Sequence, residues 1–203
     1  NPMRNILIIN GFQPNDVSEG RLSASLVERA AQLLTDAGRS VETSAIATDW
    51  DTDVELEKHA RADAVILQFP VHWMGAPWGL KRYMDVVYTA GMDGRLAHGD
   101  GRTRQDPRRQ YGAGGTMTGK PYLLSTTFNA PGEAFDDRDQ YLFRGKGLDD
   151  LLFPIHMVYR FFDMRPLPTF AALDVHKNPQ VEADFARFDA HLDSAFGLTS
   201  VPA

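Results

Sequence analysis

The chain of 203 residues contains no cysteine. It can therefore form no disulfide, hold no metal through thiolates and use no thiol as a nucleophile. It also lacks any apolar stretch as long as a bilayer span, and its first residues lack the basic and then apolar pattern of a secretory leader. From these absences we expect a cytoplasmic protein without a membrane span.

Positive charge is also scarce. The sequence has 21 Lys and Arg against 27 Asp and Glu, which gives a net charge of −6 at pH 7. Nucleic acids and anionic membranes bind concentrated Lys and Arg, so the balance argues against both as partners. The length suits one domain over residues 1–203, and a hydrophobic content of 43% is ordinary for a soluble protein.

The first third of the chain alternates strands and helices. Apolar runs at residues 5–10 and 64–69 are typical of strands buried on both faces of a parallel sheet. Between them the patterns predict a helix over residues 20–37, a strand over 40–46 and a short helix over 53–61. Leu22, Leu26, Leu33 and Ala37 are the expected buried face of the first helix. This order implies right-handed crossovers, with the first and third strands as neighbours.

The remaining elements are predicted from similar patterns. Pro77 suits the first turn of a helix that buries Leu80, Met84, Val87 and Tyr88. Residues 91–120 are polar and Gly-rich without a period, and loops of that length usually bind something or pack on a partner. The later elements are a fourth strand over 121–127, a helix over 148–162 that Pro154 must kink or begin, a fifth strand over 168–173, and a closing helix that buries Val181, Phe185, Phe188, Leu192 and Phe196.

The helix over residues 148–162 is apolar nearly all round. Phe153, Met157, Val158 and Phe161 lie outside its main stripe, so a second surface has to cover them. A subunit interface and a simply central helix remain equally open.

Several signatures fail. Residues 114–120 match most of a phosphate-binding loop, but Pro121 stands where a Mg²⁺-binding Ser or Thr is required, and the segment precedes a strand. The glycines do not form the G-x-G-x-x-G fingerprint of dinucleotide-binding folds. Residues 49–53 imitate a calcium loop, but Val54 replaces its turn glycine. The histidines show no metal-binding spacing, and Ser125 has no nucleophile elbow. We expect no metal.

Two loops carry the functional prediction. Large side chains, among them His72, Trp73 and Met74, follow the third strand at the sheet edge where open α/β sheets bind ligands. Ser18, Ser23 and Ser25 bracket the start of the first helix, where hydroxyls and free N–H groups suit a phosphate or diphosphate. The alternative is that one serine merely caps the helix. Together the loops favour a flavin nucleotide in an α/β, flavodoxin-like parallel sheet of order 2-1-3-4-5.

Several motifs resemble one family. They are residues 5–11, 73–78, 100–104 with Tyr111 and Gly112, 129–131 with 133–135, and 166–170. With these motifs the chain resembles the bacterial NAD(P)H:quinone oxidoreductases called modulator of drug activity B. The resemblance implies a homodimer that binds FAD tightly, takes a hydride from NADPH or NADH, and passes two electrons to a quinone.

The resemblance also implies the cofactor contacts. They are Ser18, Glu19, Gly20, Arg21, Leu22, Ser23, Ala24, Ser25, His72, Trp73, Met74, Gly75, Tyr111, Thr127, Phe128, Asn129 and Ala130. His72 and Phe128 depart from the family pattern, which has Trp at both positions. Tyr111 is expected to reach a flavin, across the subunit interface in a shared site. No catalytic side chain is identified. A flavodoxin-type electron carrier and a flavin-binding regulatory subunit remain alternative functions.

Overall fold

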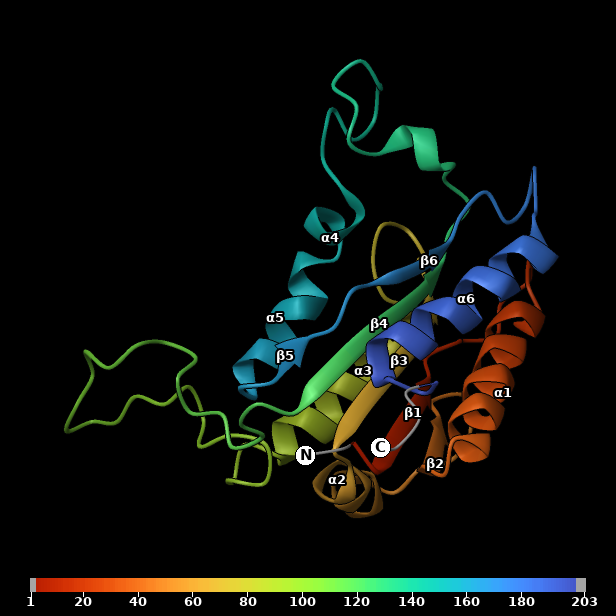
Figure 1. Cartoon of the computed structure of the whole chain (residues 1–203). Helices are drawn as coiled ribbons and strands as arrows, with labels where there is room; N and C mark the ends of the chain where they lie inside the picture. Colours follow the sequence, from red (N-terminus) through yellow and green to blue (C-terminus); the bar gives the residue numbers. More distant parts are fainter. Residues whose placement is uncertain (1–2, 200–203) are drawn as a thin grey trace.

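The computed structural model describes residues 3–199, and the remaining residues of the predicted domain, 1–2 and 200–203, lie outside them (Figure 1). Its centre is one parallel sheet in which the strands lie in the order β2-β1-β3-β4-β5, with β6 also paired to β4. The strands are β1 (Asn5–Asn10), β2 (Ser40–Ala45), β3 (Ala64–Pro70), β4 (Pro121–Thr127), β5 (Arg165–Pro166) and β6 (Phe170–Ala172). The predicted fold class and strand order are confirmed.

Helices cover both faces of the sheet (Figure 1). One face packs on α1 (Arg21–Asp36) and α6 (Val181–Phe196). The other packs on α2 (Thr52–Arg61), on α3 (Trp78–Tyr83) with its π-helical continuation η1 (Met84–Tyr88), and on α5 (Phe153–Phe161), which follows the short α4 (Leu148–Leu151). A 3-10 turn, η2 (Gly132–Ala134), lies after β4. Among residues 3–199, no helix is long and apolar enough to cross a membrane.

The sequence placed several details incorrectly. On α6, Val181 was expected to be buried but is 40% exposed. On α1, Leu26 is buried as expected, but its buried neighbours are Ser23, Ala30 and Leu34, whereas Leu22, Leu33 and Ala37 are only half-buried. The buried stripe is therefore rotated by about one residue. Pro77 precedes α3 as its N-cap and does not lie in its first turn. The fifth strand expected over 168–173 is the shorter β6, and the preceding β5 was not predicted. Pro166 and Pro168 keep β5 and β6 from forming one continuous strand, because they lack the N–H that such a strand donates.

Other expectations are confirmed. Leu80, Met84, Val87 and Tyr88 are buried. Pro154 lies in the first turn of α5, so it begins that helix and does not kink it. Residues 91–120 form a long excursion that projects from the body of the protein near the start of β4 (Figure 1). Its end is fastened by a hydrogen bond from the Met117 N–H to the Phe162 carbonyl at 2.9 Å.

A buried polar chain ties α2 to η1 and α5. The fully buried His59 donates from Nδ1 to the Glu55 carbonyl at 2.7 Å, since a carbonyl only accepts. Its Nε2 must then accept from the Tyr88 hydroxyl at 3.1 Å, and Tyr88 accepts from Tyr159 at 3.0 Å. Burial lowers the pKa of His59 and raises that of Tyr88 well above its ordinary value. Burial and these hydrogen bonds therefore keep the His59 side chain neutral.

The first prediction concerns the pH dependence of stability. As pH falls through the ordinary histidine pKa of 6.5, His59 binds a proton in the unfolded chain but not in the folded protein. The free energy of unfolding should therefore fall with pH from there toward the lower folded pKa. His59→Gln should flatten this part of the profile, and His98→Gln, at an exposed position, should not. Urea unfolding between about pH 5 and pH 8 measures it. An unchanged slope in His59→Gln would refute the assignment.

Candidate functional site

A cleft of about 500 Å³ lies where the strands end. Because the strands are parallel, the loops after β1, β3, β4 and β6 leave from the same edge of the sheet (Figure 1). Backbone hydrogen bonds tie neighbouring loops together. They join the Gly11 N–H to the Gln68 carbonyl at 2.7 Å, the Val71 N–H to the Thr127 carbonyl at 2.8 Å, and the Phe128 N–H to the Ala172 carbonyl at 2.9 Å. The loops thus form one connected rim around the cleft.

The first side of the cleft is the amino end of α1. Its N-cap, Gly20, has a left-handed φ of 76° and gives no side-chain cap. A Cβ there would lie 2.4 Å from the Phe12 ring, so both the backbone and the packing require glycine. Ser18 accepts a hydrogen bond from the Gly20 N–H at 3.2 Å. Ser23 is 3% exposed, and its hydroxyl has no hydrogen-bond partner within residues 3–199.

This arrangement suits an anion. No acidic side chain occupies the first turn of α1, and Glu19 just before it is ion-paired with Arg21, so the partial positive charge of the helix start has no acidic partner within that turn. N–H groups at a helix start point outward, and the Ser23 hydroxyl lines the same cleft. A phosphate placed here would receive hydrogen bonds from both.

The second side is a tight turn after β3. Trp73 and Met74 have left-handed φ values of 46° and 68°. His72 and Gly75 pair across them, with N–H to carbonyl distances of 2.9 and 3.2 Å. Two left-handed central residues define a type I′ turn, which Asn and Gly normally form. Holding two large residues there costs about 1–2 kcal/mol each. Such strain is characteristic of ligand sites.

The turn presents large surfaces to a ligand. Trp73 is 88% exposed, although Trp is usually well buried. A Cβ built on Gly75 would meet nothing within 4 Å, so the backbone there is open to close approach. A tryptophan at this position could either line the site or seal the core. The exposure of Trp73 and its place in the cleft wall support the first reading.

The third side is Phe128, directly after β4. Its ring is held from behind by two other aromatic rings, with centroids 6.1 Å away for Phe135 and 6.4 Å for Phe143. Asn129 follows it and is exposed. The cleft therefore combines an anion-binding end with flat apolar walls, which suits a ligand that carries both a phosphate and an aromatic ring.

The structure brings most of the predicted contacts together. Those that line the cleft are Ser18, Gly20, Leu22, Ser23, His72, Trp73, Met74, Thr127, Phe128 and Asn129. Those outside its lining are Glu19, Arg21, Ala24, Ser25, Gly75, Tyr111 and Ala130. Within α1 the division follows helix geometry, since positions 23 and 25 point about 160° apart.

Some lining residues were missed by sequence reasoning. They are Phe12, Asn15, Val17, Pro70, Val71, Val175 and His176. Val175 and His176 follow β6, whose carboxyl end lies at the same edge. Placing the last strand correctly at Phe170–Ala172 would have identified them.

Tyr111 lies elsewhere. It is 75% exposed and packs edge-on against Phe161 of α5, with ring centroids 5.9 Å apart. The excursion that carries it leaves from the end of the sheet opposite the cleft (Figure 1). Tyr111 therefore does not line the cleft of its own chain.

Comparison with known proteins identifies the family. Residues 4–195 match the family described by its flavodoxin-like fold. The chain is 42% identical to the NADPH:quinone oxidoreductase MdaB of Haemophilus influenzae, over 95% of this chain and 100% of that protein. It is 40% identical to an uncharacterized protein of Schizosaccharomyces pombe, over 95% of this chain and 97% of that protein. The chain belongs to this flavodoxin-like family and is MdaB-like.

Solved structures show the same fold. An NADPH-quinone reductase from P. pentosaceus superposes with a TM-score of 0.66 at 20% identity, over 98% of this chain and all of that one. General stress protein 14 from Treponema denticola, crystallised with FMN, gives a TM-score of 0.63 at 17% identity, over 96% and 99% of the two chains. At these identities the likeness concerns the fold alone.

Proposed function

We propose that this member of the flavodoxin-like family is an FAD-dependent NAD(P)H:quinone oxidoreductase that moves two electrons from NADPH or NADH to a quinone. The observation that carries the proposal is the cleft, where an open helix start and an exposed aromatic turn meet. The relative from Haemophilus influenzae, an NADPH:quinone oxidoreductase, aligns over its whole length at 42% identity.

The residues present fit a flavin. The α1 amino end and the hydroxyls of Ser18 and Ser23 would hold its phosphate groups, and Trp73, Met74 and Phe128 would flank its ring. FAD is favoured over FMN because the lining continues past the phosphate end to Val17, Leu22 and His176. Val17 is 84% exposed and offers apolar surface that an adenosine would cover.

A bound flavin would supply the redox chemistry, accepting a hydride at N5 and returning two electrons to the quinone. The protein's part is to bind, orient and exclude water. The linked rim fixes the ring-facing residues relative to the phosphate end. The exposed side of Trp73 offers a flat face on which a nicotinamide or a quinone can stack. If the nicotinamide and the quinone use the same slot in turn, the oxidised nicotinamide has to leave before the quinone binds.

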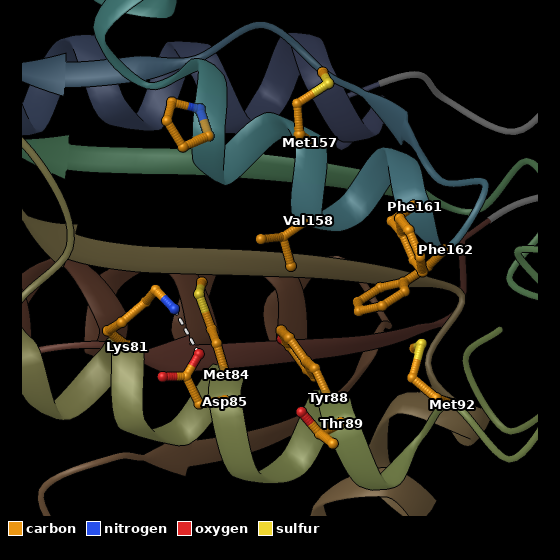
Figure 2. A pocket seen from close by; sticks show the side chains of 11 residues that line it. Lys81, Met84, Asp85, Tyr88, Thr89, Met92, Met157, Val158, Phe161 and Phe162 are labelled. Atoms are coloured by element: carbon orange, nitrogen blue, oxygen red, sulfur yellow. Dashed lines mark hydrogen bonds and ion pairs between the residues drawn. The ribbon is translucent and has the colours of Figure 1, made fainter. Parts of the chain in front are cut away.

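The proposal includes a homodimer. An apolar groove of about 360 Å³ separates η1 from α5, lined by Met84, Tyr88, Met92, Met157, Val158 and Phe161 (Figure 2). Phe161, at the edge of this groove, also packs against Tyr111. A partner covering α5 would therefore meet Tyr111 as well. Since Tyr111 does not line its own cleft, any contact it makes with a flavin would be with the flavin of the partner.

The second prediction tests cofactor and activity. The purified protein should be yellow, release FAD at about one per chain, and oxidise NADPH rapidly when a quinone is present. Double-reciprocal plots at several quinone concentrations should be parallel, as a ping-pong order requires. Mass identification of the pigment and steady-state kinetics measure these. Release of FMN with slow NADPH oxidation would favour an electron carrier, and intersecting lines would exclude the alternating slot.

The third prediction tests the phosphate end. Ser18→Ala and Ser23→Ala should each weaken FAD binding about tenfold or more, because hydrogen bonds to charged groups contribute about 1.5–3 kcal/mol. Ser25→Ala, the same change outside the cleft lining, is the matched control. Apoprotein titration with FAD, followed by flavin fluorescence, measures the dissociation constants. Equal affinity in all three variants would move the phosphate site elsewhere.

The fourth prediction tests the interface. Phe161→Glu should dissociate the dimer and lower activity and FAD retention together, because an unpaired charge in an apolar interface costs several kcal/mol. Val181→Glu, at an exposed position of α6 across the sheet, should leave the dimer intact. Light scattering and the flavin content after gel filtration measure both effects. A wild type that is monomeric and fully active would contradict the shared site.

A further inference from the structure

A second pocket, of about 470 Å³, lies on the other side of α5. Apolar surface from Phe153, Met157, Leu167 and Pro168 forms most of its wall, together with a few polar side chains. It shares no lining residue with the cleft at the carboxyl edge. Nothing in the proposed redox reaction uses it.

Its polar side chains form a continuous hydrogen-bonded chain. Tyr122 Oη lies 2.6 Å from His156 Nδ1, His156 Nε2 lies 2.9 Å from Asp149 Oδ1, and the Thr169 hydroxyl donates to the same Asp149 oxygen at 2.6 Å. Because the Asp149 carboxylate only accepts, a neutral His156 carries its proton on Nε2. Its Nδ1 must then accept from the Tyr122 hydroxyl.

This assignment fixes what the pocket can offer a ligand. Both hydroxyl protons are used, Tyr122 toward His156 and Thr169 toward Asp149. The oxygens of Tyr122 and Thr169 therefore face a ligand as acceptors only. The remaining polar side chain in the lining is Arg160, whose guanidinium has no hydrogen bond or ion pair within the described residues 3–199.

Arg160 acts on the same phenol. Burial, and after it the Asp149 charge, raise the pKa of Tyr122 to about 12 against the opposing charge of Arg160. An unpaired guanidinium thus stands beside an apolar pocket whose other polar atoms accept hydrogen bonds. Guanidinium binds planar carboxylates through two parallel hydrogen bonds.

We propose that this pocket is a second ligand site that binds a small hydroxyaromatic carboxylate. The ring lies against the apolar wall, the carboxylate pairs with Arg160, and the ring hydroxyl donates to Thr169 or Tyr122. The site goes beyond the proposed redox function and does not depend on it. The alternative is that the hydrogen bonds from Asp149 to Tyr122 serve only to hold α4 and α5 against β4. In that case Arg160 binds no ligand.

The test uses the purified protein with whatever cofactor it retains, titrated by calorimetry with three probes. These are 4-hydroxybenzoate, benzoate, which lacks the donor, and the uncharged 4-hydroxybenzamide. Saturable 4-hydroxybenzoate binding in the millimolar range or tighter is expected, about threefold to tenfold stronger than benzoate binding. The amide should bind about tenfold more weakly or not at all. Absence of saturable 4-hydroxybenzoate binding to folded protein would overturn the proposal.

Variants locate the binding. Arg160→Met should weaken the binding of 4-hydroxybenzoate about tenfold or more. Arg109→Met, at an exposed position of the excursion, should leave that binding unchanged. Thr169→Val should lower the affinity for 4-hydroxybenzoate toward that for benzoate, and it should leave the affinity for benzoate unchanged. Trp73→Ala reports on the cleft. Loss of binding in Trp73→Ala but not in Arg160→Met would place the acid in the cleft and refute the second site. Thermal melting of each variant confirms that it is folded.

Discussion

The parallel pairing of β1, β3 and β4 is the constraint on which the remaining structure depends. It puts their carboxyl ends at one edge, and the chain must reverse there without leaving buried backbone groups unpaired. Each reversal meets this requirement by bonding to its neighbour, as the Gly11 N–H does with the Gln68 carbonyl. The rim that satisfies the backbone also fixes the positions of Ser18, Trp73 and Phe128 relative to one another. Site geometry is here a result of hydrogen-bond satisfaction in the sheet.

Sequence patterns predicted the sheet well because buried parallel strands have few alternatives. The uncharged run that became β3 and the segment that became β4 were placed nearly residue for residue, and the strand order followed from crossover handedness. Helix faces were less certain, since Leu22 and Leu33 are as apolar as the residues that α1 does bury. The packing of α1 against the sheet and α6 decides between them. Pro166 and Pro168 separate β5 from β6, and the sequence pattern identified only the region of β6.

The candidate site was predictable where a residue type had a chemical reason to be there. Serines at a helix start and large side chains after a strand are unusual in combination, and the structure puts Ser18, Ser23 and Trp73 around one cleft. Backbone conformation was not predictable, because no residue at 73 or 74 indicates a left-handed turn. Nor could the place of Tyr111 be predicted, since a long polar excursion has no period to orient it. Its contact with Phe161 is known only from the fold.

The π-helical turn of η1 has a consequence for how this chain can vary. An α-helix advances about 100° per residue, so five positions would leave Tyr88 about 140° away from Tyr83. The wider turn over Met84–Tyr88, with bonds to the fifth residue, brings both phenols to the same side. Tyr83 then reaches Glu55 at 2.9 Å and Tyr88 reaches His59. Deleting one residue from this segment would restore a regular helix and remove the His59 donor. The length of this segment is therefore constrained more tightly than the identity of most of its residues.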